Sequence, residues 1–249
     1  MDASAHAFAY GMRQTRATLH SWQRRPLVVT GRWVAGSSLA ATGLLVAVLL
    51  VALLDHGYQQ VVSLQPPFAV GNTTDVLQIM RSNLLVLALH AMACVAGFIA
   101  GSSLPLQAEH HSGVSRWVHE HGGRIAIAFV ICATMFSLSA QAYVIGHTLA
   151  GVSHFLGVSP ALLLLGVLPH AAPELIALFL PLAAWIIASR RGEWDQLLAA
   201  TIVTVALAIP VLVLAALVEV YLSPHLFTML THIHPPIVRN SEGWIVTVR

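Results

Sequence analysis

The sequence predicts an all-α fold: a polytopic membrane helical bundle with about five transmembrane helices and one re-entrant or broken half-helix. Of the 249 residues, 57% are hydrophobic and only 9% are charged, whereas a soluble domain carries about 25% charged residues. The mean hydropathy is +0.78. Several uncharged stretches reach about 20 residues, the length of a helix that crosses a bilayer. These observations argue against a soluble enzyme, a disordered chain and a nucleic-acid-binding protein.

Four apolar stretches each predict one membrane span, and they cover residues 34–54, 83–106, 125–145 and 197–222. The region 155–188 is too long for one simple span and too short for two. It is divided by four prolines: Pro160, Pro169, Pro173 and Pro181. Because proline removes a helical hydrogen bond and clashes with the preceding turn, we expect a half-helix over 160–168, a break from Pro169 to Pro173, and a span that runs to residue 188. The alternative is a six-span protein in which residues 155–168 cross the membrane.

The arginines predict the orientation, because cytoplasmic loops of membrane proteins are enriched in basic residues. The chain has no lysine, and the first 33 residues contain Arg13, Arg16, Arg24, Arg25 and Arg32. With the N-terminus inside, the arginine-containing loops 107–124 and 189–196 also fall on the cytoplasmic side. The sequence thus predicts a cytoplasmic amphipathic segment over 1–33, a membrane helical domain over 34–222 and an extracytoplasmic tail over 223–249.

The N-terminal segment mixes apolar side chains with arginines. This composition suits a helix that lies on the anionic inner leaflet and ends before Pro26. A polar tail without fixed structure is the alternative.

Small residues in the apolar stretches predict close helix packing. Gly97 and Gly101 form a Gly-x-x-x-Gly pattern in the second stretch. Such a pattern lets two helix backbones approach, either within one chain or at a homodimer seam. We expect a homo-oligomer.

Two carboxylates, Glu174 and Glu219, fall inside the long apolar stretches. A charged group at membrane depth is costly, so each of them predicts a functional site. If Pro173 is the first helical residue after the break, Glu174 lies in the first turn, where the helix dipole stabilises a negative charge. His170 precedes it by four positions, and the pair could relay protons, bind a cation or join two helices by a hydrogen bond. Glu219 is either part of such a site or an interfacial carboxylate.

Histidines carry the remaining candidate chemistry. His90 lies within the second stretch, where it either forms a hydrogen bond across helices or takes part in a proton path. The loop after that stretch offers four candidate metal ligands: His110, His111, His119 and His121. Their spacing matches no zinc signature. The loop is therefore a candidate metal site without a diagnostic motif, and we expect no cofactor.

The sequence also lacks the motifs of intramembrane hydrolases. It has no Gly-x-Ser-x-Gly, no His-Glu-x-x-His and no aspartate pair in the spans. Without lysine, Schiff-base and P-loop chemistry are excluded. We expect no enzyme activity, and a hydrolase that uses His170 and Glu174 is the weakest alternative.

Three segments occur together in the order Arg81-Ser82-Asn83-Leu84 with Gly97 and Gly101, then Leu168-Pro169-His170-Ala171-Ala172-Pro173-Glu174-Leu175, then Ala216-Leu217-Val218-Glu219-Val220-Tyr221-Leu222-Ser223-Pro224. In order and spacing they resemble the stage II sporulation protein M family, whose hallmark is a Pro-His-Gly-x-x-Glu stretch and a last helix ending in Ala-x-x-Glu-x-x-x-x-Pro. Here Ala171 stands where the family has glycine. The resemblance implies a multi-pass protein of the bacterial cytoplasmic (inner) membrane that is not known to be an enzyme. It also implies other membrane or envelope proteins as partners, among them an ATPase.

Two functions follow as expectations. The first is a non-enzymatic membrane scaffold or assembly subunit that recruits or anchors partner proteins in an envelope-remodelling or export complex. The alternative is the membrane subunit of an ATPase-driven exporter or transporter with a polar path at His170 and Glu174. The expected partners are proteins and the lipid bilayer, and no nucleic acid, since the net charge is only +2.

Overall fold

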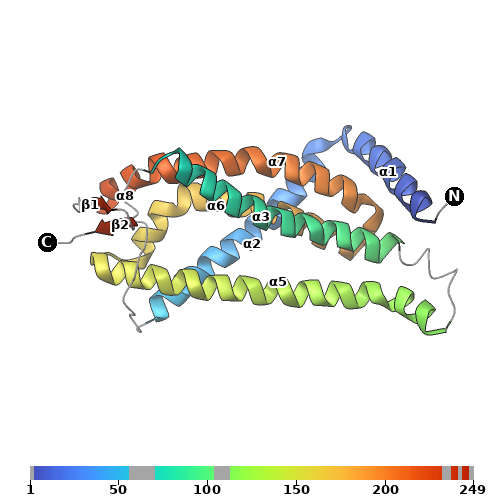
Figure 1. Cartoon of the computed structure of the whole chain (residues 1–249), viewed down its shortest axis with the longest axis horizontal. Helices are drawn as coiled ribbons and strands as arrows, with labels where there is room; N and C mark the ends of the chain where they lie inside the picture. Colours follow the sequence, from blue (N-terminus) through green and yellow to red (C-terminus); the bar gives the residue numbers. More distant parts are fainter. Residues whose placement is uncertain (1–2, 56–70, 104–112, 232–236, 241–242, 247–249) are drawn as a thin grey trace. The chain divides into compact units, whose positions relative to one another are not determined.

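The computed structural model describes residues 3–55, 71–103, 113–231, 237–240 and 243–246 (Figure 1). Its long helices are α1 (Ala3–Trp22), α2 (Pro26–Leu54), α3 (Thr73–Phe98), α5 (Gly113–Leu156), α6 (Pro160–Arg191) and α7 (Leu197–Leu217). Shorter helical elements are η1 (Ile99–Ser103), η2 (Trp194–Gln196), η3 (Val218–Leu222) and α8 (Ser223–Thr231). Two antiparallel strands, β1 (Ile237–Asn240) and β2 (Gly243–Val246), pair so that Ile237 lies opposite Val246.

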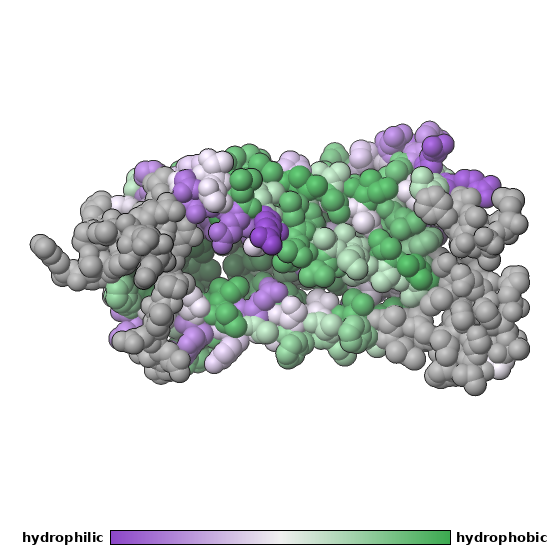
Figure 2. Space-filling model, in the orientation of Figure 1, coloured by the Kyte–Doolittle hydropathy of each residue, from purple (hydrophilic) through white to green (hydrophobic). Residues whose placement is uncertain are grey.

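Five helices among the described residues are long and apolar enough to cross a membrane: Pro26–Leu54, Thr73–Gly101, Ile127–Leu156, Pro160–Arg191 and Trp194–Thr231. Apolar side chains cover much of the visible surface of these helices (Figure 2). The predicted class, an all-α bundle of five membrane-length helices, is confirmed. The boundaries differ, because α2 already begins at Pro26, where proline is well tolerated in the first turn of a helix.

The predicted break between Pro169 and Pro173 is wrong. The helix α6 runs without interruption for 32 residues, from Pro160 to Arg191, and passes through Pro169, Pro173 and Pro181. A separate half-helix over 160–168 therefore does not exist, and Glu174 lies in mid-helix rather than in a first turn. In an apolar environment each proline removes one helical donor, whereas a break would expose several backbone groups at once, so the continuous helix is favoured.

Glycines with left-handed backbone conformation end two of the helices. Gly157 (φ 67°) follows α5, and Gly192 (φ 68°) follows α6. After α5, the N–H of Val158 donates to the carbonyl of Ser153 (3.1 Å), and the N–H of Gly157 donates to His154 (3.3 Å). This is the Schellman pattern, which satisfies the last carbonyls of a helix and turns the chain sharply.

The chain forms two compact units. Unit 1 comprises Met1–Ala40, Leu84–Phe136 and Ile176–Ile209, and unit 2 comprises Ala41–Asn83, Ser137–Leu175 and Pro210–Arg249. In unit 1, every residue of α6 from 177 to 185 is buried, which makes this segment the core of the unit.

Glycines bring two other helices close to that core segment. A Cβ atom added at Gly36 of α2 would lie 3.2 Å from the Cβ of Ala183. One added at Gly97 of α3 would lie 2.6 Å from the Nε1 of Trp185. Gly97 thus packs within the chain, as does Gly101, whose added Cβ would meet the ring of Trp194 at 2.3 Å.

In unit 2, an apolar cluster centres on Leu163 of α6 and Phe227 of α8. Gly166 lies against the Phe227 ring, since a Cβ added there would be 2.9 Å from its Cε1. The predicted tail over 223–249 therefore begins with a helix whose Phe227 belongs to the core of unit 2.

Candidate functional site

The first polar contact of the candidate site joins α6 to α8 in unit 2. The Nδ1 of His170 lies 2.7 Å from the Oγ of Ser223, and the two residues are 53 positions apart in the chain. Both are buried, with exposed fractions of 8% and 3%. The hydroxyl either donates to the ring or accepts from it, depending on the histidine tautomer. A buried pair of this kind stabilises the contact between two helices.

One turn further along α6, the carboxylate of Glu174 meets polar groups from two other elements. It interacts with the carboxylate of Glu219 from η3 and with the side chain of Asn83 from α3. Both glutamates are partly buried, and Asn83 is buried. Although Asn83 interacts with Glu174, its Nδ2 makes no hydrogen bond of good geometry. The site therefore holds two carboxyl groups and one incompletely used donor inside the candidate spans.

The element that carries Glu219 is a π-helix. Over Val218–Leu222 the turns are wider than in an α-helix, and the N–H of Ser223 bonds to the carbonyl of Val218, five residues back. Such a turn inserts an extra residue into the helix and changes the direction of the side chains that follow, and π-turns are frequent at functional sites. Here it separates α7 from α8, so that Glu219 interacts with Glu174 while Ser223 bonds to His170.

The start of α3, which positions Asn83, is fixed by a capping box. The Oδ1 of Asn72 accepts from the N–H of Asp75 (3.3 Å) and from that of Thr74 (2.8 Å), and the Oδ2 of Asp75 accepts from the N–H of Asn72 (2.7 Å). These bonds satisfy donors that the first turn leaves free. The N–H of Gly71 also donates to the carbonyl of Val220 in η3 (3.3 Å). The start of α3 and the π-helix are therefore tied to each other.

The structure brings together three of the residues predicted from the sequence, His170, Glu174 and Glu219, within unit 2. The predicted pairing is different, because His170 bonds to Ser223 and Glu174 interacts with Glu219. Sequence reasoning assigned no role to Asn83 or Ser223, although both belong to the segments that carried the family resemblance. A polar residue inside an apolar stretch was the signal available for Asn83.

His90 belongs to unit 1 and to a different arrangement. Its Nδ1 lies 2.8 Å from the carbonyl oxygen of Leu178 in α6. One turn further along α3, the Sγ of Cys94 donates to the carbonyl of Pro181 (3.1 Å). Of the two interpretations that the sequence left open for His90, this geometry favours the hydrogen bond across helices.

None of the residues that the structure describes form a group of three or more histidine, cysteine or acidic side chains that could hold a metal ion. The four candidate ligands from the sequence, His110, His111, His119 and His121, fall outside the residues whose side chains are described. That hypothesis stays a prediction.

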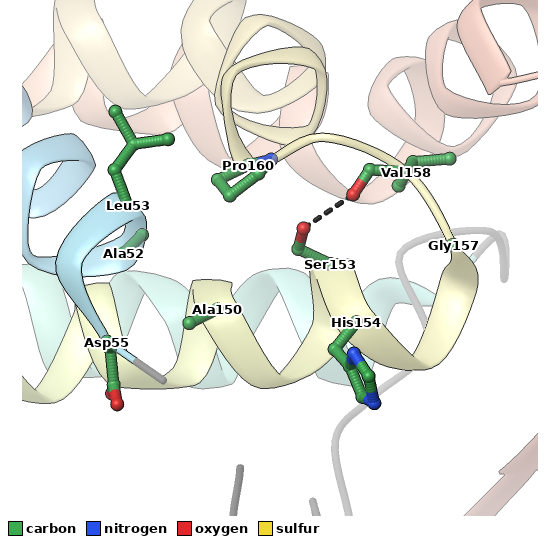
Figure 3. Close-up of a pocket in the computed structure, with 9 residues that line it drawn as sticks. All are labelled: Ala52, Leu53, Asp55, Ala150, Ser153, His154, Gly157, Val158 and Pro160. Atoms are coloured by element: carbon green, nitrogen blue, oxygen red, sulfur yellow. Dashed lines mark hydrogen bonds between the residues drawn. The ribbon is translucent and has the colours of Figure 1, made fainter. Parts of the chain in front are cut away.

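A pocket of about 360 Å³ lies in unit 2, between the end of α2, the last turns of α5 and the start of α6 (Figure 3). Its polar residues are Asp55, Ser153 and His154. Ser153 donates to the carbonyl of Val158, which holds the turn after α5, and Asp55 pairs with His147 of α5. These contacts hold α2 and the connection between α5 and α6 in place, and sequence reasoning did not foresee them.

No protein-family model, no curated protein and no solved structure matches the chain. The resemblance to the stage II sporulation protein M family is therefore a prediction that rests on the sequence segments alone.

Proposed function

We propose that this chain is the membrane subunit of a transport system, in which the Glu174–Glu219 pair binds and releases a proton. The observation that carries this proposal is that two partly buried carboxylates, from α6 and η3, lie within candidate membrane spans and near enough to repel each other. Two negative charges in this position repel each other and lose their hydration, so that a proton or a cation has to accompany them. A purely structural contact is better served by a neutral pair such as His170 and Ser223.

The third member of the site supports two protonation states. The Nδ2 of Asn83 is a buried donor without a bond of good geometry, and it belongs to a side chain that interacts with Glu174. Such a donor stabilises the ionised carboxylate more than the protonated one. The site can thus hold Glu174 in either form, which a proton-binding step requires.

The experiment compares Glu174→Gln, Glu219→Gln and the double variant with the wild type in proteoliposomes. Infrared difference spectroscopy across a pH titration detects a protonated carboxyl group directly, and a pH-sensitive dye in the vesicle lumen follows proton flux under an imposed gradient. Glu193→Gln, which lies outside the candidate spans, is the matched control. We expect each site variant to remove the carboxyl band that the control retains. A band that persists in the double variant contradicts the proposal.

A second candidate is the membrane scaffold that anchors partner proteins. The observation that favours it is the α5 segment of unit 1, where no residue from 127 to 136 is buried and Phe129, Met135 and Phe136 are 71%, 60% and 78% exposed. A helix with such an exposed apolar surface can pack against a partner helix or a second copy of the chain. A pull-down in mild detergent with mass spectrometry tests it, because Phe129→Ala with Phe136→Ala is expected to release the partner and leave the bundle folded.

We further propose that the protein lies in the bacterial inner membrane with its N-terminus in the cytoplasm. The arginine-rich N-terminal segment and loops support this orientation. An ATPase on the cytoplasmic side would supply the energy for transport, since the chain has no nucleotide-binding motif. Labelling of His20→Cys or His225→Cys in intact cells, with Cys94 and Cys132 replaced, tests the orientation. We expect an impermeant thiol reagent to label position 225 and not position 20, and the opposite pattern contradicts the proposal.

A further inference from the structure

The N-terminal helix α1 is held against the rest of unit 1 by a small and polar face. The Nε2 of Gln14 donates to the Oδ2 of Asp195 in η2 at 2.6 Å. Thr15 and Thr18 on the same face are buried, and a Cβ added at Gly11 would lie 3.3 Å from side-chain atoms of Leu198. This face is therefore occupied by protein and does not contact lipid.

The turn between α1 and α2 is also fixed. The rings of Trp22 and Trp33 meet edge to face, with centroids 5.2 Å apart. The N–H of Arg25 donates to the carbonyl of Trp22 (3.0 Å), and the N–H of Val28 donates to that of Arg25 (3.2 Å). Arg24 and Arg25 are thus held next to the first turn of α2.

Around this turn lies a surface that combines exposed cations with exposed apolar side chains. We call it the elbow surface, and it consists of Arg16, Arg24, Arg25, Leu27, Val28 and Arg32, all exposed. Leu27 is 84% exposed and Val28 is 51% exposed. Hydrophilic side chains gather over α1, in contrast to the apolar surface of the long helices (Figure 2). Large apolar side chains exposed among arginines are expected where acyl chains meet phosphate groups.

We infer that the elbow surface binds anionic phospholipid. Its arginines contact the headgroup phosphates, and Leu27 and Val28 enter the adjoining acyl region. Charge complementarity favours this occupant, since the surface contains four arginines and no acidic residue. This inference is independent of the proposed transport function. It also narrows the lipid contact that the sequence predicted for residues 1–33 to the turn between α1 and α2 and the residues beside it.

The test uses the full chain in detergent micelles, titrated with short-chain phosphatidylglycerol or with phosphatidylcholine of the same tails. Native mass spectrometry counts the bound lipids. We expect Arg24→Gln with Arg25→Gln to weaken phosphatidylglycerol binding about 25-fold, since each arginine near an anionic surface strengthens binding about fivefold. Binding of phosphatidylcholine stays unchanged in this variant. Leu27→Asn weakens binding of both lipids, because it removes the apolar contact that they share.

The matched control is Arg190→Gln with Arg191→Gln, which removes two exposed arginines from the end of α6 in the same unit. It is expected to leave phosphatidylglycerol binding within about twofold of the wild type, because it keeps every arginine and apolar residue of the elbow surface. An equal loss in the two double variants overturns the inference, since the binding would then follow total charge. Binding of inorganic phosphate that is as tight as that of phosphatidylglycerol also overturns it, since free phosphate makes no contact with Leu27 or Val28.

Discussion

The Nδ1 of His90 in α3 lies 2.8 Å from the carbonyl oxygen of Leu178 in α6, three residues before Pro181. The proline has no N–H and disturbs the helical bonding of the turn before it. On the next turn of α3, Cys94 donates to the carbonyl of Pro181 itself. Two side chains of α3 thus bond to backbone carbonyls of α6 in the buried core of unit 1, and these bonds tie the two helices together.

Replacement of His90 should therefore weaken the fold. We expect His90→Leu to lower the free energy of unfolding by about 1 kcal/mol, because one interhelical hydrogen bond is lost. His90→Gln, which keeps a donor, should recover part of this loss. Thermal unfolding in detergent micelles measures both variants. A His90→Leu protein of wild-type stability with impaired proton flux would instead assign His90 to a proton path.

The packing of Gly97 predicts a severe effect of the smallest possible substitution. In Gly97→Ala the new methyl group would lie 2.6 Å from the Nε1 of Trp185 and 2.9 Å from the Cδ1 of Leu197, so that α3 and α6 have to move apart. We expect a loss of about 1–3 kcal/mol in stability. Gly43→Ala is the control, because a Cβ added at Gly43 meets nothing within 4 Å. Alanine also has a higher helix propensity than glycine, so this variant should not lose stability. Equal stability of the two variants would contradict the packing.

A double-mutant cycle measures the contact between His170 and Ser223. We expect His170→Leu and Ser223→Ala each to destabilise the protein, since each leaves the other polar group buried without a partner. The double variant should lose less than the sum of the two, with an interaction energy of about 0.5–1.5 kcal/mol. Thermal unfolding of the four proteins provides the values. Strict additivity would show that the two side chains do not stabilise each other.

Position 157 requires glycine because of its backbone conformation, and not because a side chain would clash with its neighbours. Its φ is 67°, yet a Cβ added there meets nothing within 4 Å. We expect Gly157→Ala to cost about 1 kcal/mol, the strain of a side chain in the left-handed region. Gly157→Asn should cost less, because asparagine tolerates this region. If alanine and asparagine lower the unfolding temperature equally, the turn has rearranged.

The sequence by itself determined the class of the protein. Stretches of about 20 apolar residues have to be helical in a bilayer, because every backbone group needs a partner within its own segment. This condition is local, and it predicted four of the five membrane-length helices found among the described residues, whereas the fifth, α6, was expected to be broken. The free-energy cost of a carboxylate at membrane depth also singled out Glu174 and Glu219, since this cost can be recognised from the sequence without knowing the neighbouring residues.

Only the tertiary structure decided the course of α6 and the partners of its polar residues. Read locally, Pro169 and Pro173 favour a break, but helix packing in an apolar environment overrides the cost of a missing donor. His170 meets Ser223 from 53 residues away, and Glu174 meets Asn83 and Glu219 from two other elements. Contacts over such distances depend on how α3, α6 and the π-helix pack, and no local pattern encodes that packing.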